Sequence, residues 1–367
     1  MTTASTGLSE RELVERDALV GRLYESTIGA LELLHVYLGD RLGLYMALAT
    51  AGPLTAAGLA SAAGISERYA REWMEQEAVA GILEVDADDG TGGRRYSLPR
   101  GHAEVLIDPD STNFFAPVAR GLVAVAAVMP KVMDAFRTGG GVPYEAYGED
   151  MRSSISSLNR PGFVNLLGTT WFPAITDVDQ RLRSQPPARV ADVGCGTGWS
   201  SIGIAKAYPL AEVDAFDIDE ASIADARRNA QASGVADRIR FEVRDAADPS
   251  LAGKYDLVTA FETIHDMSNP VGALKAMRAL ARTGGSVVVA DERVAEEFAA
   301  PGDERERFMY GWSAVHCLPV GMVDSPSAGT GTVMRPSRLR EYARAAGFAD
   351  VEILPVENDF WRFYRLV

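Results

Sequence analysis

The stretch RVADVGCGTGWSSIGIAKAY, residues 189–208, decides the fold. Its first five residues form a short apolar run typical of a buried strand, and SSIGIAKAY has the character of a helix. Between them lies Asp192-Val-Gly194-Cys-Gly196-Thr-Gly198, whose glycines let the backbone approach a ligand closely. The first N–H groups of the following helix have no intrahelical partner and would face that ligand. The segment therefore predicts a ligand-binding loop between a strand and a helix.

Two common nucleotide-binding loops do not match this segment. The dinucleotide fingerprint G-x-G-x-x-G requires a third glycine at position 199, where Trp199 stands instead. A phosphate-binding P-loop needs Gly-Lys followed by Ser or Thr, but Lys254 is followed by Tyr255. The remaining pattern is D-x-G-x-G-x-G.

The chain beyond residue 189 alternates between strand-like and helix-like segments. The expected strands are 189–193, 212–218, 238–243, 255–261, 286–291, 351–356 and 361–366, with helices at 200–208, 220–234, 273–281 and 337–348. Alternating strands and helices predict an α/β fold with a doubly wound, mostly parallel sheet. Residues 292–335 are not needed for that sheet and are expected to form an insertion.

The whole C-terminal half resembles the class I S-adenosylmethionine-dependent methyltransferases. Their first motif matches the loop of Asp192, Gly194, Gly196 and Gly198. Further motifs follow in order at the ends of later strands: an acid that binds the ribose (Asp217), an acid with a small neighbour at the adenine (Asp245 and Ala246), and a strand end beside the methionine (Phe261 and Glu262). The resemblance implies a Rossmann-like, seven-stranded sheet whose last strand is antiparallel, and S-adenosylmethionine as cofactor.

A purely structural role is the alternative for the two aspartates. Asp217 and Asp245 each precede an expected helix, and aspartate is a common N-cap residue. Taken together, the ordered set of four motifs favours cofactor binding.

The N-terminal half is predicted to be mostly helical. Leu34, Leu38, Leu42 and Tyr45 follow a helical spacing, and residues 53–98 read as helix, turn, helix and hairpin, the winged-helix pattern. A second helical stretch is expected from about Thr112 to Thr138, and SQPPAR, residues 184–189, reads as a linker. We expect a winged-helix domain at 1–108, a helical cap at 109–185 and the methyltransferase domain at 186–367, with the insertion 292–335 as a lid.

His265 is the candidate general base, because of the four histidines it alone follows an expected parallel strand. The resemblance to winged-helix, dimeric small-molecule O-methyltransferases implies a catalytic His-Asp pair here, matched by His265-Asp266. A role in shaping the cofactor pocket is the alternative for His265, and capping of the next helix is the alternative for Asp266. Glu292, just after the following strand, is the better-placed candidate to orient His265, with a solvated loop carboxylate as its alternative.

The insertion is expected to supply one wall of the acceptor pocket. Its segment FMYGWSAVHCLPVGM mixes aromatic, soft and polar side chains, of which Tyr310, Trp312, His316 and Met322 are the candidate pocket residues. They are equally compatible with the ordinary core of a lid. Adjacent His316 and Cys317 make a poor metal site, because neighbours seldom both reach one ion, so we expect no metal.

The expected winged helix is acidic on its second helix. Residues 66–80 hold four glutamates against two arginines, whereas a DNA-reading helix needs cationic contacts. The resemblance implies dimerisation instead, so we expect a homodimer without nucleic acid. The chain as a whole carries 36 basic and 51 acidic residues, a net charge of −15, which also disfavours nucleic acid.

Composition and motifs together define the expected function. The chain has 367 residues, 47% of them hydrophobic, and two cysteines, too few for a disulfide framework. With no signal-like or spanning segment recognised, we expect a cytoplasmic protein that does not contact membranes. The predicted activity is S-adenosylmethionine-dependent methyl transfer to a small molecule, most plausibly at a hydroxyl. Carbon or nitrogen methylation, or a cofactor-sensing regulator without transfer activity, are the alternatives.

Overall fold

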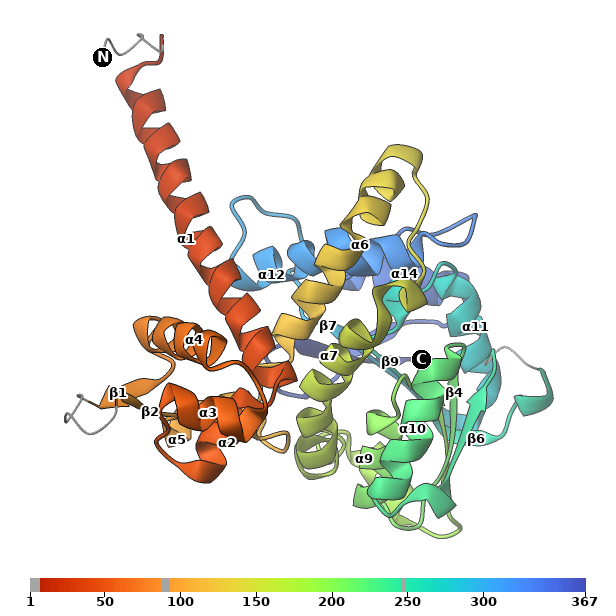
Figure 1. The fold of residues 1–367 in the computed structure, drawn as a ribbon. Coiled ribbons are helices and arrows are strands. Elements are labelled where there is room, and N and C mark those ends of the chain that lie inside the picture. The colour runs from red at the N-terminus through yellow and green to blue at the C-terminus, as the bar shows by residue number, and fades with distance from the viewer. Residues whose placement is uncertain (1–6, 87–92, 246–248) are drawn as a thin grey trace. The chain divides into compact units, whose positions relative to one another are not determined.

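The structure, a computed structural model, describes residues 7–86, 93–245 and 249–367. It divides into two compact units, residues 1–123 and 124–367, which are described separately (Figure 1). The first unit is helical with one small hairpin. The second contains the large sheet.

A long first helix opens the N-terminal unit. Helix α1 (Glu10–Arg41) begins at Ser9, whose side chain and that of Glu12 form a reciprocal capping box. The helix ends just before Gly43, which adopts a φ of 67° that favours glycine, and α2 (Leu44–Ala51) starts there. The leucine spacing had predicted one helix through Tyr45. The break at Gly43 instead buries Tyr45 and leaves Leu34, Leu38 and Leu42 more than 40% exposed.

The winged-helix prediction is confirmed. Helices α3 (Ala56–Ala63) and α4 (Glu67–Val79) are followed by strands β1 (Glu84–Asp86) and β2 (Arg95–Ser97), which pair antiparallel. The predicted turn between these strands falls mainly on residues 87–92, outside the described residues. Helix α5 (Arg100–Ile107) completes the unit, and its core includes Tyr45, Leu59, Trp73 and Tyr96.

Several helices precede the sheet. Helix α6 (Val118–Thr138) crosses the division between the units, and η1 (Tyr144–Tyr147), α7 (Gly148–Pro161), the π-helix η2 (Gly162–Trp171) and α8 (Thr176–Arg183) follow. The serine-rich segment 153–162 lies largely within α7. Serine has only modest helix propensity, so this helix was not evident from the sequence.

The second unit is built on a seven-stranded sheet in the order β5-β4-β3-β6-β7-β9-β8. Its strands are β3 (Arg189–Val193), β4 (Glu212–Asp217), β5 (Ile239–Val243), β6 (Tyr255–Phe261), β7 (Ala281–Glu292), β8 (Val351–Ile353) and β9 (Trp361–Leu366). Strands β3 to β7 pair in parallel, and β9 runs antiparallel to both of its neighbours. The predicted fold class, including the antiparallel last strand, is confirmed.

Helices cover both faces of the sheet, because alternate residues of its buried strands point to opposite sides (Figure 1). One face packs against α9 (Trp199–Ala207), α10 (Glu220–Ala232) and the π-helix η2; the other packs against α11 (Pro270–Leu280) and α14 (Pro336–Ala345). The insertion forms α12 (Glu304–Trp312), the π-helix η6 (Ser313–Cys317) and α13 (Leu318–Gly321).

Within the described ranges, the helices are too short or too polar for any of them to cross a lipid bilayer.

Candidate cofactor and methyl-transfer site

The glycine loop has the conformation that its sequence predicted. Gly194, Gly196 and Gly198 all have positive φ angles, between 50° and 84°. A Cβ atom on Gly194 would lie 2.3 Å from Thr263 Oγ1, and one on Gly198 would collide with Phe241 and Ala226. A Cβ on Gly196 would meet nothing within 4 Å. The loop thus packs tightly against the protein on two sides and is open at its middle glycine, where a ligand has access.

Asp192 stabilises this loop from inside the protein. Its side chain is buried, and its two carboxylate oxygens accept hydrogen bonds from the hydroxyls of Ser200, Ser201 and Thr259 at 2.5–3.0 Å. These bonds tie the end of β3 to the start of α9 and to β6. The predicted cofactor role of Asp192 stays a prediction, because its hydrogen bonds in the structure go to α9 and β6.

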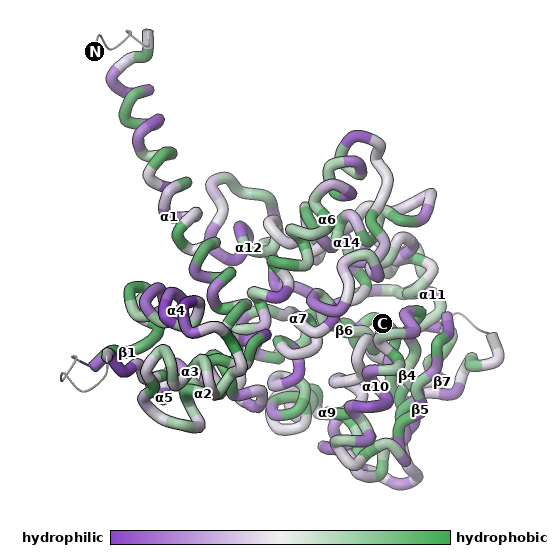
Figure 2. Tube along the Cα trace, in the orientation of Figure 1, coloured by the Kyte–Doolittle hydropathy of each residue, from purple (hydrophilic) through white to green (hydrophobic). Residues whose placement is uncertain are grey.

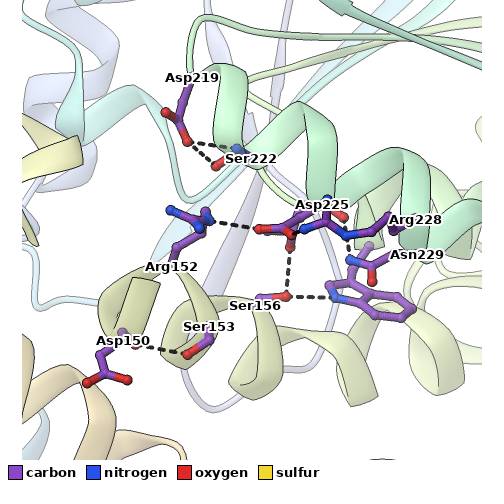
Figure 3. A network of polar contacts seen from close by, with 11 residues as sticks. Asp150, Arg152, Ser153, Ser156, Asp219, Ser222, Asp225, Arg228 and Asn229 are labelled. Atoms are coloured by element: carbon purple, nitrogen blue, oxygen red, sulfur yellow. Dashed lines mark hydrogen bonds and ion pairs between the residues drawn. The ribbon is translucent and has the colours of Figure 1, made fainter. Parts of the chain in front are cut away.

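Asp217 lies at the end of β4 beside the open part of the loop. Its Oδ2 accepts a hydrogen bond from the Gly196 N–H at 2.8 Å, and its Oδ1 accepts one from the Asp219 N–H at 2.9 Å. Burial raises the pKa of Asp217 despite these bonds. It is Asp219, not Asp217, that caps α10 through Ser222, so the helix-capping alternative for Asp217 does not hold (Figure 3).

The predicted adenine contacts are only partly described. Asp245 is exposed just beyond β5, and Ala246 lies outside the described residues. Their role stays a prediction.

Helix α7 holds the glycine loop through contacts that the sequence analysis missed. The Ser156 hydroxyl accepts a hydrogen bond from Trp199 Nε1 at 2.9 Å and bonds the Thr197 hydroxyl at 2.8 Å. Arg152 on the same helix pairs with Asp225 of α10 at 2.7 Å, and Figure 3 shows it reaching toward that carboxylate. Because serine and arginine carry no motif here, only the packing of α7 reveals this arrangement.

His265 lies between two carboxylates at the end of β6. Its Nδ1 is 2.8 Å from Asp291 Oδ1, and its Nε2 is 3.2 Å from Asp266 Oδ1. Burial alone would lower the pKa of His265, but Asp291 and Asp266 raise it well above its usual value. Burial likewise acts to raise the pKa of Asp266, and the His265 imidazolium brings it below its usual value. These opposite shifts favour the ion-paired form of His265 and Asp266.

The residue that orients His265 is Asp291, not the expected Glu292. Both belong to β7, where consecutive side chains point to opposite faces, so only one of them can meet the imidazole. Glu292 instead contacts Glu262. Burial, and to a smaller extent the Glu262 carboxylate, raises the pKa of Glu292 well above its usual value. Asp266 does meet His265, although the two are sequence neighbours, and Asn269 rather than Asp266 caps the next helix.

Glu262 adopts a strained backbone conformation at the end of β6. Its φ is 50°, in the left-handed region that side-chain-bearing residues rarely occupy. Its carboxylate accepts hydrogen bonds from Trp361 Nε1 at 2.6 Å and from Asn159 of α7. The preceding Phe261 is buried against Phe163 in the core. Strain of this kind concentrates at functional sites, which fits the expected position beside the methionine part of a cofactor.

Of the four candidate pocket residues, His316 is the one that interacts with the His265–Asp266 pair. It is buried, it interacts electrostatically with Asp266 and His265, and burial lowers its pKa. Its ring packs edge-on against Tyr147 and Tyr144, at centroid distances of 4.7 and 6.0 Å. Tyr310 instead contacts Arg335 and Phe298, Trp312 packs against Phe308, and the Met322 sulfur lies near Gly329.

Tyr144 is a further site residue that the sequence analysis did not single out. Burial raises its pKa, and the carboxylates of Asp217, Asp219 and Asp266 raise it further. The phenol therefore lies within electrostatic reach of both Asp217 and the His265–Asp266 pair. Its only sequence signal was an aromatic pair following three glycines, which is too common a pattern to indicate a site.

Cys317 joins the His265 pair in space. The ligand atoms of His265, Asp266 and Cys317 all lie within 4.8 Å of one another, the one such cluster found in the residues that the structure describes. Burial raises the pKa of the Cys317 thiol to about 12, and a thiol must lose its proton to bind a metal. The absence of a metal cofactor stays a prediction.

Comparison with known proteins agrees with this fold. A methyltransferase domain model matches residues 185–331, and an Rv2258c-like winged helix-turn-helix domain model matches residues 29–107. A ubiquinone biosynthesis O-methyltransferase of Azotobacter vinelandii is 30% identical over 182 residues, which cover 48% of this chain and 72% of that protein. An uncharacterised Synechococcus protein is 37% identical over 98 residues, 26% of this chain and only 24% of that protein.

The fold extends the likeness over the whole chain. Human N-acetylserotonin methyltransferase in complex with S-adenosylmethionine superposes with a TM-score of 0.71 at 17% identity, covering 99% of each chain. The chain belongs to the S-adenosylmethionine-dependent methyltransferases. S-Adenosylmethionine is its methyl donor.

The site residues fit this cofactor. The open face at Gly196 leaves room for it, and the Asp217 carboxylate beside that glycine is suited to accept hydrogen bonds from two ribose hydroxyls. The β6 end at Glu262 abuts the glycine loop through Thr263 and Gly194, where the methionine part would lie.

Proposed function

We propose that the enzyme transfers a methyl group to a hydroxyl of a small-molecule acceptor, with His265 as general base. The bound cofactor supplies a methyl group on a sulfonium. The chain supplies the positioning of donor and acceptor for in-line displacement, and a group that takes the hydroxyl proton. Asp217 and the glycine loop hold the cofactor, and the lid residue His316 lies on the acceptor side.

One observation carries the proposal: the Asp291–His265–Asp266 arrangement at the end of β6. Asp291 accepts a hydrogen bond from His265 Nδ1, and this contact directs Nε2 toward Asp266. The methyl acceptor would approach His265 from the Nε2 side. A histidine that merely shaped the pocket would not need carboxylates at both ring nitrogens. The names of the relatives point the same way, since the Azotobacter protein is an O-methyltransferase.

The protonated state of His265 in the free protein sets a condition on this chemistry. A base must be neutral before it takes a proton, and Asp291 and Asp266 favour the charged imidazole by raising its pKa. An incoming cationic sulfonium lowers the pKa of a nearby imidazolium. Cofactor binding therefore favours the basic form of His265.

The direct test is transfer of a labelled methyl group from S-adenosylmethionine into a small-molecule extract, with the product identified by mass spectrometry. The label is expected in a methyl ether, and His265→Ala should lower the turnover about 10²–10⁴-fold with cofactor affinity nearly unchanged. A label on nitrogen or carbon would assign His265 to steering the acceptor. No labelled product would favour a cofactor-sensing regulator.

We also propose that the enzyme is a homodimer held through α1. Large apolar side chains lie exposed along this helix, at spacings that place several of them on one face: Val20, Tyr24, Leu31, Leu34 and Leu38, each at least 42% exposed. A stripe of this length would need a partner of the same length, and a second copy of the helix supplies one.

The winged helix is not proposed as a DNA reader. Helix α4 is mainly hydrophilic (Figure 2), but its two arginines are engaged: Arg71 pairs with Glu67 at 2.8 Å and Arg68 pairs with Glu72 at 2.5 Å. Arginines neutralised on their own helix are poor phosphate ligands. A gel-shift assay with fragmented genomic DNA is expected to show no complex.

A further inference from the structure

Four carboxyl groups surround His265 at the ends of β6 and β7. This acidic cluster consists of Glu262, Asp266, Asp291 and Glu292. Asp266 and Asp291 pair with the His265 imidazole, whereas Glu262 and Glu292 contact each other, and Glu262 also binds Asn159 and Trp361. One imidazolium among four carboxyl groups leaves the site with an excess of acid.

Several buried polar atoms at this place lack a hydrogen-bond partner. In the acidic cluster these are Asp291 Oδ2 and Glu292 Oε2. Outside it, His316 Nε2 is also unpartnered, on a side chain that is 3% exposed and interacts electrostatically with Asp266. Buried polar atoms are nearly always satisfied, so such a concentration indicates that a ligand completes the site. Since two of these three atoms are carboxyl oxygens, the missing group is a cation or a hydrogen-bond donor.

The order of the strands places the reacting end of the cofactor beside the acidic cluster. Asp217 ends β4, the glycine loop follows β3, and Glu262 ends β6, in the adjacent order β4-β3-β6-β7. If the ribose of the cofactor lies at Asp217 and the cofactor crosses the glycine loop, its methionine part and sulfonium point toward β6. Tyr144 interacts electrostatically with both Asp217 and Asp266, which are the two ends of this expected cofactor path.

We infer that the acidic cluster makes this enzyme bind the cationic methyl donor in preference to its neutral product. S-Adenosylmethionine and S-adenosylhomocysteine share the adenosine, ammonium and carboxylate groups, and they differ by the methyl group and the positive charge on sulfur. A sulfonium near buried carboxylates gains Coulomb energy that a thioether does not. The loss of that charge on methyl transfer then weakens product binding and favours exchange for fresh donor.

This inference rests on the proposed location of methyl transfer at the His265 segment, but it does not depend on which acceptor is used. Calorimetric titrations of the full chain with S-adenosylmethionine and with S-adenosylhomocysteine test it without any acceptor. The wild-type enzyme is expected to bind the sulfonium form about 10-fold more tightly, equivalent to about 1.4 kcal/mol. Sinefungin, which carries an amine in place of the methylsulfonium, should also bind more tightly than the thioether.

Two isosteric variants locate the source of the selectivity. Asp266→Asn and Glu262→Gln should each lower the ratio of the two affinities at least 3-fold toward unity, about 0.6 kcal/mol. As a control, Glu341→Gln alters an exposed carboxylate on α14 and should change neither affinity. Each ratio is measured on one protein preparation, so partial misfolding affects both ligands and leaves the ratio intact.

Two results would overturn the inference: equal or tighter binding of S-adenosylhomocysteine by the wild-type enzyme, or a ratio that is unchanged in both variants. Either result would leave the proposed hydroxyl acceptor and the role of His265 as base open to their own test. Conversely, a methyl group found on nitrogen or carbon would not alter the expected ratio.

Discussion

His265 Nδ1 lies 2.8 Å from Asp291 Oδ1, although 26 residues separate them in the chain. The contact joins the ends of two adjacent parallel strands, β6 and β7. This contact fixes the orientation of the imidazole ring. Burial alone would lower the pKa of His265, but the Asp291 and Asp266 carboxylates outweigh burial and raise that pKa well above its usual value. In the proposed mechanism, the protonation of this ring controls when His265 can act as a base.

Asp291→Asn is expected to shift the pH profile of turnover to lower pH. Only neutral imidazole accepts a proton, so turnover rises with pH through the raised pKa of His265, and removing one carboxylate lowers that pKa. Maximal turnover should fall about 10–100-fold because the ring loses its orienting partner. The measurement is kcat against pH with the acceptor found by labelled transfer.

Glu292→Gln is the matched control for that experiment. Burial and the neighbouring Glu262 carboxylate raise the pKa of Glu292 well above its usual value, so replacing Glu292 removes less negative charge beside His265 than replacing Asp291 does. The acid limb of the profile should stay in place. A shift as large as that of Asp291→Asn would restore Glu292 as the orienting residue.

Asp217→Ala should weaken binding of S-adenosylhomocysteine strongly. The change removes an acceptor for the ribose hydroxyls and also the bond that positions the Gly196 N–H. Loss of charge-assisted bonds of this kind corresponds to roughly 1.5–3 kcal/mol, or a 10-fold to 100-fold rise in Kd. Calorimetry measures it, and undiminished affinity would contradict the assignment of the ribose site.

Ser156→Ala should loosen the hold of α7 on the glycine loop. The variant deletes the partner of Trp199 Nε1 and the Thr197 hydroxyl, and S-adenosylhomocysteine should dissociate about 5-fold faster, as expected for about 1 kcal/mol. Ser153→Ala is the control, because that hydroxyl bonds only locally to the Asp150 carbonyl (Figure 3). Stopped-flow measurement of the tryptophan fluorescence reports the rate, and equal rates in both variants would exclude a role of Ser156 in holding the glycine loop.

Glu77→Gln should stabilise the winged-helix unit above neutral pH. Glu77 is fully buried beside the Tyr45 hydroxyl at 2.7 Å, and burial raises its pKa from 4.5 to about 7. The folded state thus binds this proton more tightly than the unfolded state. The resulting stability is complete below the unfolded pKa of 4.5 and is lost as the pH rises toward 7.

A glutamine avoids that loss while still accepting the Tyr45 bond. The free energy of unfolding should rise by roughly 2 kcal/mol at alkaline pH and change little in acid. Denaturant unfolding at both pH values measures it, with the half-exposed Glu75→Gln as control. An equal effect at both pH values would show that the buried charge is not the cause.

Leu31→Glu on α1 should convert the proposed dimer to a monomer. The new charge would lie in the middle of the exposed apolar stripe, where burial against a partner becomes unfavourable. Sedimentation velocity measures the change, and Glu25→Gln on the same helix should leave the dimer intact. A wild-type protein that sediments as a monomer would refute the proposed assembly.

The sequence by itself determined the fold and the cofactor. The pattern D-x-G-x-G-x-G at Asp192 to Gly198, followed by alternating strands and helices, requires only local properties: glycine torsion angles and the periodicity of apolar residues. Asp217 could be assigned for the same reason, because parallel strands all end at one edge of the sheet. His265 and Asp266 followed from their position after β6.

Only the tertiary structure decided the partners of those residues. Asp291 and Glu292 are neighbours in sequence, but strand alternation directs one to His265 and the other to Glu262, and the choice depends on the extent of β7. Ser156, Tyr144 and Cys317 reach the site from segments 41 to 121 residues away, through the packing of α7, η1 and the insertion. Contacts at such separations are set by how whole elements pack, which no local pattern encodes.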